Sequence, residues 1–307
     1  MSGPAEAPTS GAEVGALPSV AIVGVGLIGG SLGLALRERG AARRVVAIDR
    51  DAETRRIALA RGAADAATDD LAGGIAGAEL VVLATPVGVT LGLLPRVAAE
   101  LAARPNVIVT DVGSVKGAVA RAGASAFPQG GFVAGHPMAG SERSGVAAAA
   151  PDLFAGATWA LTPTETTSPG DVARVAGLAR AVGALPLLLD PEAHDAAVAV
   201  TSHLPHVLAY ALGAVADEAA RANPRLFDLA AGSFASATRV AASPPEMWQG
   251  IASQNRAALA RALRAYVAEL EAVRVALESG DDGALGARFA AGHDAALRAG
   301  AARSPAD

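Results

Sequence analysis

The sequence places a histidine, His136, between Gly135 and Pro137, directly after a short apolar run at 131–134. Neither neighbour favours a helix, so the imidazole is expected at the end of a strand. An unperturbed imidazole has a pKa of about 6.5 and accepts a proton near neutral pH. Removing hydride from an alcohol carbon requires a base for the hydroxyl proton, and His136 is the predicted base. The alternative is a structural histidine that the backbone hydrogen-bonds.

A second polar segment, Asp111 to Lys116, follows the apolar run 106–110. Lys116 is the only lysine among 25 basic residues, which indicates a need for a compact ammonium on a flexible stem. It is expected to add positive charge or to tie the loop down. Ser114 is predicted to point its hydroxyl into the cofactor crevice, although it could also cap a following helix.

Glycines at 24, 26 and 29 lie in the run VAIVGVGLIGGS, between an apolar strand pattern and a helical pattern. This spacing is typical of a dinucleotide-binding turn, whose helix N-terminus faces the pyrophosphate. Asp49 ends the next apolar run and is expected to bond the ribose of NAD and to repel a 2′-phosphate, which Arg50 could soften. Thr85 and Pro86 are predicted to line the nicotinamide side, or to form a plain turn. The predicted cofactor-binding residues are Gly24, Gly26, Leu27, Ile28, Gly29, Asp49, Thr85 and Pro86.

A polar cluster lies in the second half of the chain. Its members, within thirteen residues, are His194, Asp195, Ser202, His203 and His206. Ser202 and His206 are four residues apart and share a helix face, and Pro205 predicts a kink that could turn His206 toward the other domain. The spacings match no standard metal site, and no metal is predicted.

Arg239 follows in GSFASATRVA, and arginine is suited to a bidentate carboxylate contact. The alternative is an ordinary surface arginine.

These residues need a frame of strands and helices. Strands are expected at 19–24, 44–49, 79–84, 106–110, 131–135, 157–162 and 184–189, and helices at 27–38, 52–61, 88–103 and 171–182. This alternation predicts an α/β fold with a doubly wound parallel sheet of the Rossmann type. Helices at 192–220, 224–231, 244–278 and 282–299 follow. The predicted organisation is a disordered tail at 1–18, a dinucleotide-binding domain at 19–190 and an all-helical substrate and dimerisation domain at 191–307.

Composition narrows the functional classes. The chain has 307 residues, 52% of them hydrophobic, a net charge of −5 and no cysteine. Without a basic tract, nucleic-acid binding is not expected, and without cysteine there is no disulfide or thiolate nucleophile. The N-terminus lacks the pattern of a signal peptide, and no membrane span is expected. The prediction is a cytoplasmic protein.

Seven segments together resemble the prephenate dehydrogenase family, which includes arogenate and cyclohexadienyl dehydrogenases. They are GVGLIGGS (24–31), DVGSVK (111–116), GHPMAGSERSGV (135–146), HD (194–195), SHLPH (202–206), TRVA (238–241) and MW (247–248). The resemblance implies oxidative decarboxylation of prephenate to 4-hydroxyphenylpyruvate in tyrosine synthesis, with NAD(P)⁺ as oxidant and a helical domain that forms a homodimer.

The resemblance also implies residue roles. His136 would accept the proton of the ring hydroxyl, and Ser114 would bond that hydroxyl and orient His136. Arg239 would anchor a substrate carboxylate. His206, Ser202 and Ser141 would contact the substrate as well, and a histidine at the position of His206 favours the pyruvyl side chain of prephenate over arogenate.

One departure from the family pattern concerns substrate preference. Ala235 and Ser236 stand where many relatives carry a basic residue and an aspartate. No chorismate mutase or regulatory ACT segment is expected in the chain.

The rival functions fall into two classes, another two-domain enzyme and a nucleotide-sensing module. A β-hydroxyacid dehydrogenase would use a lysine from the helical domain, and this chain has none after Lys116. An imine reductase would not need a histidine between glycine and proline, as His136 is here. A non-catalytic nucleotide sensor predicts binding without turnover.

Overall fold

The computed structural model describes residues 17–141 and 143–301. The predicted disordered tail therefore lies outside the described residues up to position 16, and the first strand begins at Leu17.

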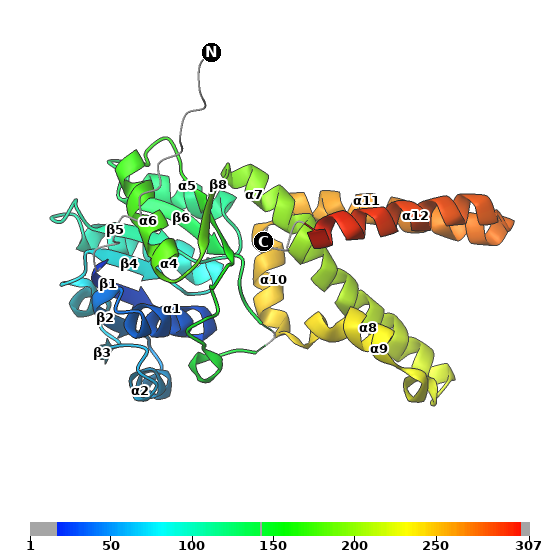
Figure 1. Cartoon of the computed structure of the whole chain (residues 1–307), viewed down its shortest axis with the longest axis horizontal. Helices are drawn as coiled ribbons and strands as arrows, with labels where there is room; N and C mark the ends of the chain where they lie inside the picture. The colour runs from blue at the N-terminus through cyan, green and yellow to red at the C-terminus, as the bar shows by residue number, and fades with distance from the viewer. Residues whose placement is uncertain (1–16, 142, 302–307) are drawn as a thin grey trace, which may run out of the picture. The chain divides into compact units, whose positions relative to one another are not determined.

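In the described part of the chain, an eight-stranded sheet forms the frame, with strand order β3-β2-β1-β4-β5-β6-β7-β8 (Figure 1). The strands are β1 (Leu17–Val23), β2 (Ala42–Ile48), β3 (Ala66–Thr68), β4 (Leu80–Leu83), β5 (Ile108–Asp111), β6 (Phe132–Pro137), β7 (Thr158–Thr162) and β8 (Leu185–Leu188). The expected Rossmann-type sheet is confirmed, and β1 to β6 are parallel. One strand departs from the expected parallel arrangement, since β7 runs antiparallel to β6. The connection between them contains a three-residue 3₁₀ turn, Val146–Ala148, where a parallel crossover needs a longer element, usually a helix.

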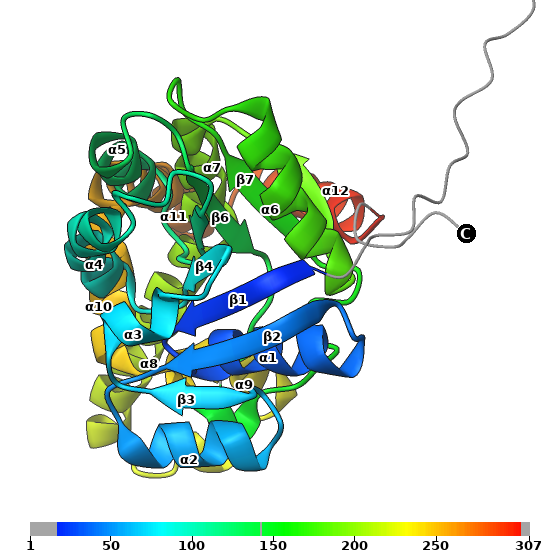
Figure 2. The ribbon, with the colours of Figure 1, turned by 90° about the vertical axis from the view of Figure 1, so that its left-hand side faces the viewer.

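Helices cover both faces of the sheet (Figure 2). One face packs against α1 (Leu27–Glu38), α2 (Ala52–Ala60) and α6 (Pro169–Ala181), and the other against α3 (Leu71–Ile75), α4 (Val87–Glu100) and α5 (Gly117–Ala126). Strand β1 serves both cores, since Val20 and Ile22 face one and Ala21 and Val23 the other. This follows from the period of two along a strand and explains why the strands read as continuous apolar runs.

The strand order reverses at the centre of the sheet. From β1 the chain continues outward to β2 and β3, and it then crosses to β4 on the other side of β1. In open α/β sheets, ligands bind in the crevice at the carboxyl ends of the strands beside such a switch point. The predicted cofactor residues and His136 follow or end strands at this edge.

The helical elements after the sheet are α7 (Pro191–Val198), α8 (Leu204–Ala222), α9 (Gly232–Thr238) and α10 (Pro245–Gln254). The predicted continuous helix at 192–220 contains a π-helical turn, Ala199–His203, directly before the proline-bearing start of α8. The predicted helix at 224–231 is only a short 3₁₀ turn, Leu226–Leu229. The predicted helix at 244–278 is two helices, which meet at Asn255 and Arg256.

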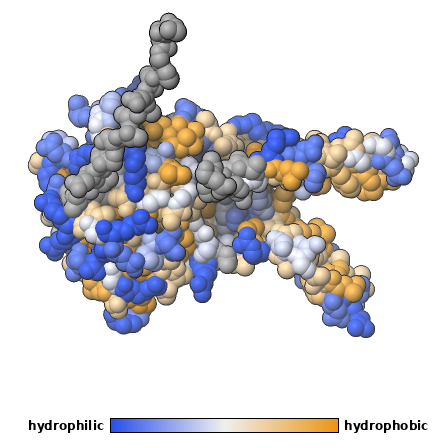
Figure 3. All heavy atoms as spheres, viewed as in Figure 1, coloured by the Kyte–Doolittle hydropathy of each residue, from blue (hydrophilic) through white to orange (hydrophobic). Residues whose placement is uncertain are grey.

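Residues from Arg256 onward form a separate compact unit. It consists of α11 (Arg256–Ser279) and α12 (Asp282–Ala301), joined by a turn in which Gly280 has a φ of +67°. An ion pair of 2.9 Å between Arg288 and Glu269 links the two helices. The hairpin exposes large apolar side chains (Figure 3), namely Val267, Leu270, Val275, Leu277, Phe289 and Leu297.

One helical run, Pro191–Ala222, is long and apolar enough to cross a membrane by composition, with a mean hydropathy of 1.3. It also carries the buried polar side chains of His194, Asp195 and His203. Within residues 17–141 and 143–301, no group of three histidine or acidic side chains is arranged to hold a metal ion.

Candidate active site

The turn between β1 and α1 requires glycine for steric reasons. Gly24 has a φ of +90°, and a Cβ at Gly29 would lie 2.0 Å from the carbonyl oxygen of Gly24. Nothing lies within 4 Å of a Cβ built at Gly26, so open space remains in front of α1. The first turn of α1 begins with Leu27 and Ile28, and its N–H groups have no partner within the helix. Open space before these donors fits a pyrophosphate.

Asp49 lies directly after β2, beside the glycine turn. Its Oδ2 accepts a hydrogen bond of 3.0 Å from the Val25 amide, and its Oδ1 accepts one of 3.0 Å from the Asp51 amide. The two amides hold the carboxylate at the mouth of the turn, which is where the ribose of a bound dinucleotide is expected.

Thr85 and Pro86 follow β4 on the other side of the same turn. The Thr85 hydroxyl is 2.9 Å from that of Thr90 in α4. A Cβ at Gly24 would lie 2.8 Å from Cγ2 of Thr85, so these two strand ends are in close contact. The predicted cofactor residues from β1, β2 and β4 are thus brought together at one edge of the sheet.

Lys116 is fully buried and connects two strand ends. Its Nζ donates to Asp111 Oδ2 at 2.5 Å and to the carbonyl oxygen of Gly135 at 2.7 Å. Asp111 Oδ1 accepts from the Gly135 amide at 3.0 Å. Burial lowers the pKa of the Lys116 ammonium, against the opposing effect of the Asp111 carboxylate. The buried pair holds both polar groups of Gly135 and thereby fixes the backbone that carries His136.

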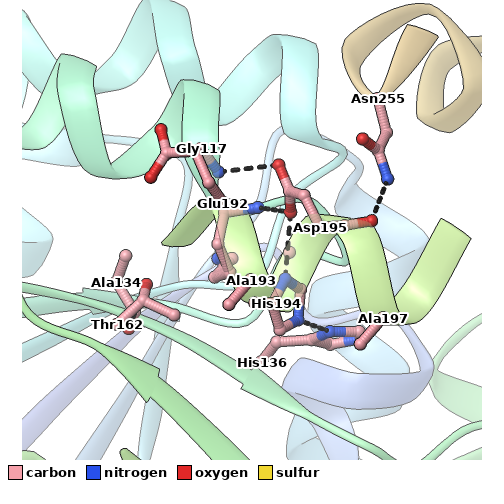
Figure 4. Close-up of polar contacts among 12 residues, drawn as sticks. Gly117, Ala134, His136, Thr162, Glu192, Ala193, His194, Asp195, Ala197 and Asn255 are labelled. Carbon is pink, nitrogen blue, oxygen red and sulfur yellow. Dashed lines mark hydrogen bonds and ion pairs between the residues drawn. The ribbon is translucent and has the colours of Figure 1, made fainter. Parts of the chain in front are cut away.

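His136 is half-buried at the end of β6, and its partner comes from the helical part of the chain (Figure 4). His136 Nδ1 lies 2.9 Å from Nε2 of His194 in α7. The other ring nitrogen of His194, Nδ1, lies 2.9 Å from Asp195 Oδ1. Three titratable side chains therefore form one hydrogen-bonded row that ends at the crevice.

Asp195 also joins α7 to the nucleotide-binding sheet. Its Oδ1 accepts from the Lys116 amide at 2.7 Å, and its Oδ2 accepts from the Gly117 amide at 2.9 Å. These donors are at the N-terminus of α5, where a carboxylate is favoured by the helix dipole. The Asp195 carbonyl oxygen accepts from Asn255 Nδ2 at 2.8 Å.

Burial sets the protonation of this group. It lowers the pKa of His136 well below its usual value, and positive charge on His194 and Lys116 would act in the same direction. Burial alone would raise the pKa of Asp195, but hydrogen bonds from His194 and from the α5 amides bring it below its usual value. At neutral pH, His136 is therefore neutral and able to accept a proton, and Asp195 is ionised.

His203 and His206 follow α7, at the end of the π-helical turn and in the first turn of α8. His203 Nδ1 is 3.1 Å from Asn255 Nδ2, and burial lowers its pKa to about 4. His206 Nδ1 donates to the Ser202 carbonyl oxygen at 2.9 Å, and its ring stacks on Trp248 with centroids 3.4 Å apart. The pKa of His206 is lowered by burial and, to a smaller extent, by the charge of Arg239.

The remaining predicted site residues, Arg239, Ser114 and Ser141, lie on different elements of the structure. Arg239 is exposed, yet its charge acts on His206, so the two are electrostatic neighbours. Ser114 lies half-buried between β5 and α5, and the helix begins after Lys116 with no side-chain cap from it. Ser141 is exposed, and its hydroxyl accepts from the Arg143 amide.

In the structure the His136 ring is bonded to His194, and the resemblance had implied that Ser114 bonds the substrate hydroxyl and orients His136. The sequence pattern groups His194 and Asp195 with the later histidines but assigns them no role. Their adjacency to a histidine 58 residues earlier exists only in the folded chain.

Comparisons with known proteins match most of the described chain. The family model for the prephenate dehydrogenase nucleotide-binding domain matches residues 32–186, and the model for the prephenate dehydrogenase dimerization domain matches residues 190–291. Prephenate dehydrogenase of Bacillus subtilis is 34% identical over 86% of this chain and 71% of its own length. Cyclohexadienyl dehydrogenase of Zymomonas mobilis is 36% identical over 85% of this chain and 89% of its own length.

Solved structures agree with these matches. Prephenate dehydrogenase of Aquifex aeolicus in complex with hydroxyphenyl propionate and NAD⁺ superposes with a TM-score of 0.84 at 29% identity, covering 92% of this chain and 98% of that one. Arogenate dehydrogenase of Synechocystis superposes with a TM-score of 0.77 at 30% identity, covering 91% and 99% of the two chains.

Proposed function

The chain belongs to the prephenate dehydrogenase family, and we propose that it converts prephenate to 4-hydroxyphenylpyruvate and CO₂ by NAD-dependent oxidative decarboxylation. It is a dehydrogenase of the prephenate and cyclohexadienyl group, and its cofactor is NAD. The open space before α1 and the carboxylate of Asp49 fit that cofactor. The choice of prephenate and the residue roles below are the proposal.

The observation that carries the proposal is the setting of His136. It stands at the carboxyl end of β6, half-buried, bonded through one ring nitrogen to His194 and with a pKa well below its usual value. An imidazole that is neutral at neutral pH keeps a lone pair that can accept a proton, as a general base requires.

NAD⁺, when bound, accepts a hydride from the ring carbon that carries the hydroxyl. His136 takes the proton of that hydroxyl, so this carbon becomes a carbonyl carbon. The bond from the ring to its carboxylate then breaks, CO₂ leaves, and the electron pair of that bond makes the ring aromatic. His136 returns its proton to the resulting phenolate oxygen, which restores the base for the next turnover.

Other residues of the crevice hold the substrate in this proposal. Ser114 bonds the reacting hydroxyl, and Arg239 binds a substrate carboxylate as a planar guanidinium can. His206 and Ser202 contact the side-chain end, and Ser141 contributes from the loop after β6. The electrostatic coupling of Arg239 with His206 supports placing these two side chains around one ligand.

We further propose that the chain acts as a soluble, cytoplasmic homodimer in tyrosine biosynthesis. The match to the family's dimerization domain and the apolar side chains exposed on α11 and α12 support the dimer.

The direct test is reduction of nicotinamide by the purified protein, with prephenate and arogenate each crossed with NAD⁺ and NADP⁺. Prephenate with NAD⁺ is expected to give the highest kcat/KM. Preference for arogenate would overturn the substrate assignment, and NAD binding without any turnover would establish a nucleotide sensor instead.

The base role has its own test. His136→Asn is expected to lower kcat by roughly 10²–10⁴-fold, because the hydroxyl proton loses its acceptor, while the dissociation constant for NAD stays unchanged. His293→Asn, at an exposed position of α12, serves as the control. A normal rate in His136→Asn removes this residue from the mechanism.

A further inference from the structure

The row from Asp195 through His194 to His136 is joined by two hydrogen bonds of 2.9 Å. His194 uses both of its ring nitrogens in the row, one toward His136 and one toward the Asp195 carboxylate. His136 uses only Nδ1 in the row. A neutral imidazole has one N–H and one lone pair, so the direction of each hydrogen bond decides the next one.

The starting point is the Asp195 carboxylate, which can only accept when ionised. It already accepts from the amides of Lys116 and Gly117 at the N-terminus of α5, so it stays ionised in its buried setting. His194 Nδ1 must then carry a proton in order to bond Asp195 Oδ1. The lone pair of His194 is consequently on Nε2, which faces His136.

We propose that His194 is a positioning residue that fixes His136 as the Nδ1–H tautomer and so leaves the Nε2 lone pair of His136 for the substrate hydroxyl. The proposal rests on the base role of His136 given above. In the opposite tautomer, two lone pairs would face each other across 2.9 Å, and Nε2 would carry a proton and could not act as the base.

The surrounding charges favour this arrangement. Lys116 and Asp111 are paired with each other below Gly135, and His203 faces the carbonyl side of Asp195 through Asn255. A proton taken up by His136 is therefore connected to the Asp195 carboxylate through the hydrogen bonds of the neutral His194 ring. His194 is 1% exposed, so it acts on the reaction through His136 and not by touching substrate.

The first measurement is independent of turnover. Nitrogen chemical shifts of ¹⁵N-histidine-labelled protein, recorded without substrate at neutral pH and assigned with His136→Asn, report which ring nitrogen carries the proton. We expect the Nδ1–H form for both His136 and His194, and loss of the Nδ1–H preference of His136 in His194→Leu. An Nε2–H form of His136 in the wild-type protein overturns the proposal, whatever the substrate turns out to be.

The second measurement separates tautomer control from a merely structural role. His194→Gln keeps an amide oxygen that can accept from His136 and an amide N–H that can donate to Asp195, whereas His194→Leu keeps neither. We expect kcat to fall by roughly 10²–10³-fold in the leucine variant and less than about tenfold in the glutamine variant. KM for NAD should stay unchanged in both, and His293→Leu should behave as wild type.

The pH profile completes the test. In His194→Leu, protonated His136 loses its acceptor, so the acid limb of kcat/KM is expected to move to lower pH. An unmoved acid limb, or equal losses in the glutamine and leucine variants, contradicts the proposal. If the wild-type protein turns over neither prephenate nor arogenate, the proposed function fails while the nitrogen shifts still decide the tautomer.

Discussion

Replacing Lys116 by methionine tests the buried ion pair that supports His136. Methionine fills similar space but removes the ammonium, which leaves the Asp111 carboxylate buried beside Gly135. Both partners of the pair have no exposed side-chain surface. Breaking such a pair from one side typically costs about 3–5 kcal/mol, because an uncompensated charge remains.

The remaining contacts of Asp111 reduce the expected cost. Its oxygens still accept from the amides of Gly113 and Gly135, so we expect a loss near the lower end, about 3 kcal/mol. A domain with a total stability of about 5–15 kcal/mol stays folded after this loss. Because Gly135 loses its ammonium contact, kcat should fall as well.

The assay is urea unfolding followed by circular dichroism for Lys116→Met, Asp111→Asn and the double variant. The double variant removes both charges, so it should lose less stability than the sum of the two single variants. The matched control is Arg43→Met, which breaks the ion pair of Arg43 with Glu79, whose side chains are 65% and 49% exposed. That pair should contribute less than about 1 kcal/mol. Strict additivity, or a cost of Lys116→Met no greater than that of Arg43→Met, would refute the reasoning.

Two further predictions concern the cofactor turn and acid stability. Gly29→Ala places a Cβ 2.0 Å from the Gly24 carbonyl oxygen, so both the free energy of unfolding and the NAD affinity in a calorimetric titration should fall. Gly26→Ala meets nothing within 4 Å and should weaken NAD binding alone. Equal stability of the two variants contradicts the steric argument. Burial lowers the pKa of His203 to about 4 in the folded chain, from about 6.5 in the unfolded chain. The contribution of neutral His203 to the free energy of unfolding is therefore complete above pH 6.5 and is lost as the pH falls toward 4. His203 alone then accounts for about 3 kcal/mol, and urea midpoints that do not decrease between pH 7 and pH 4.5 would contradict it.

Local features were predictable from the order of residues. The spacing of Gly24, Gly26 and Gly29 depends on contacts within one strand–turn–helix unit, and the helix predicted at 27–38 is the one observed. The alternation of apolar runs with helical patterns likewise predicted most strands within one or two residues. Short elements rich in alanine and glycine were not predicted, as with β3 and α3, because three to five residues carry too little periodicity.

What the sequence determined by itself is therefore the glycine turn after the first strand, the acid that follows the second strand and a histidine at a strand end. Only the tertiary structure decided which side chains contact that histidine. The pairing of His136 with His194 and the burial of Lys116 against Asp111 depend on how α7 and α5 pack on the sheet. Such long-range contacts are set by the burial of whole elements, and no spacing along the chain encodes them.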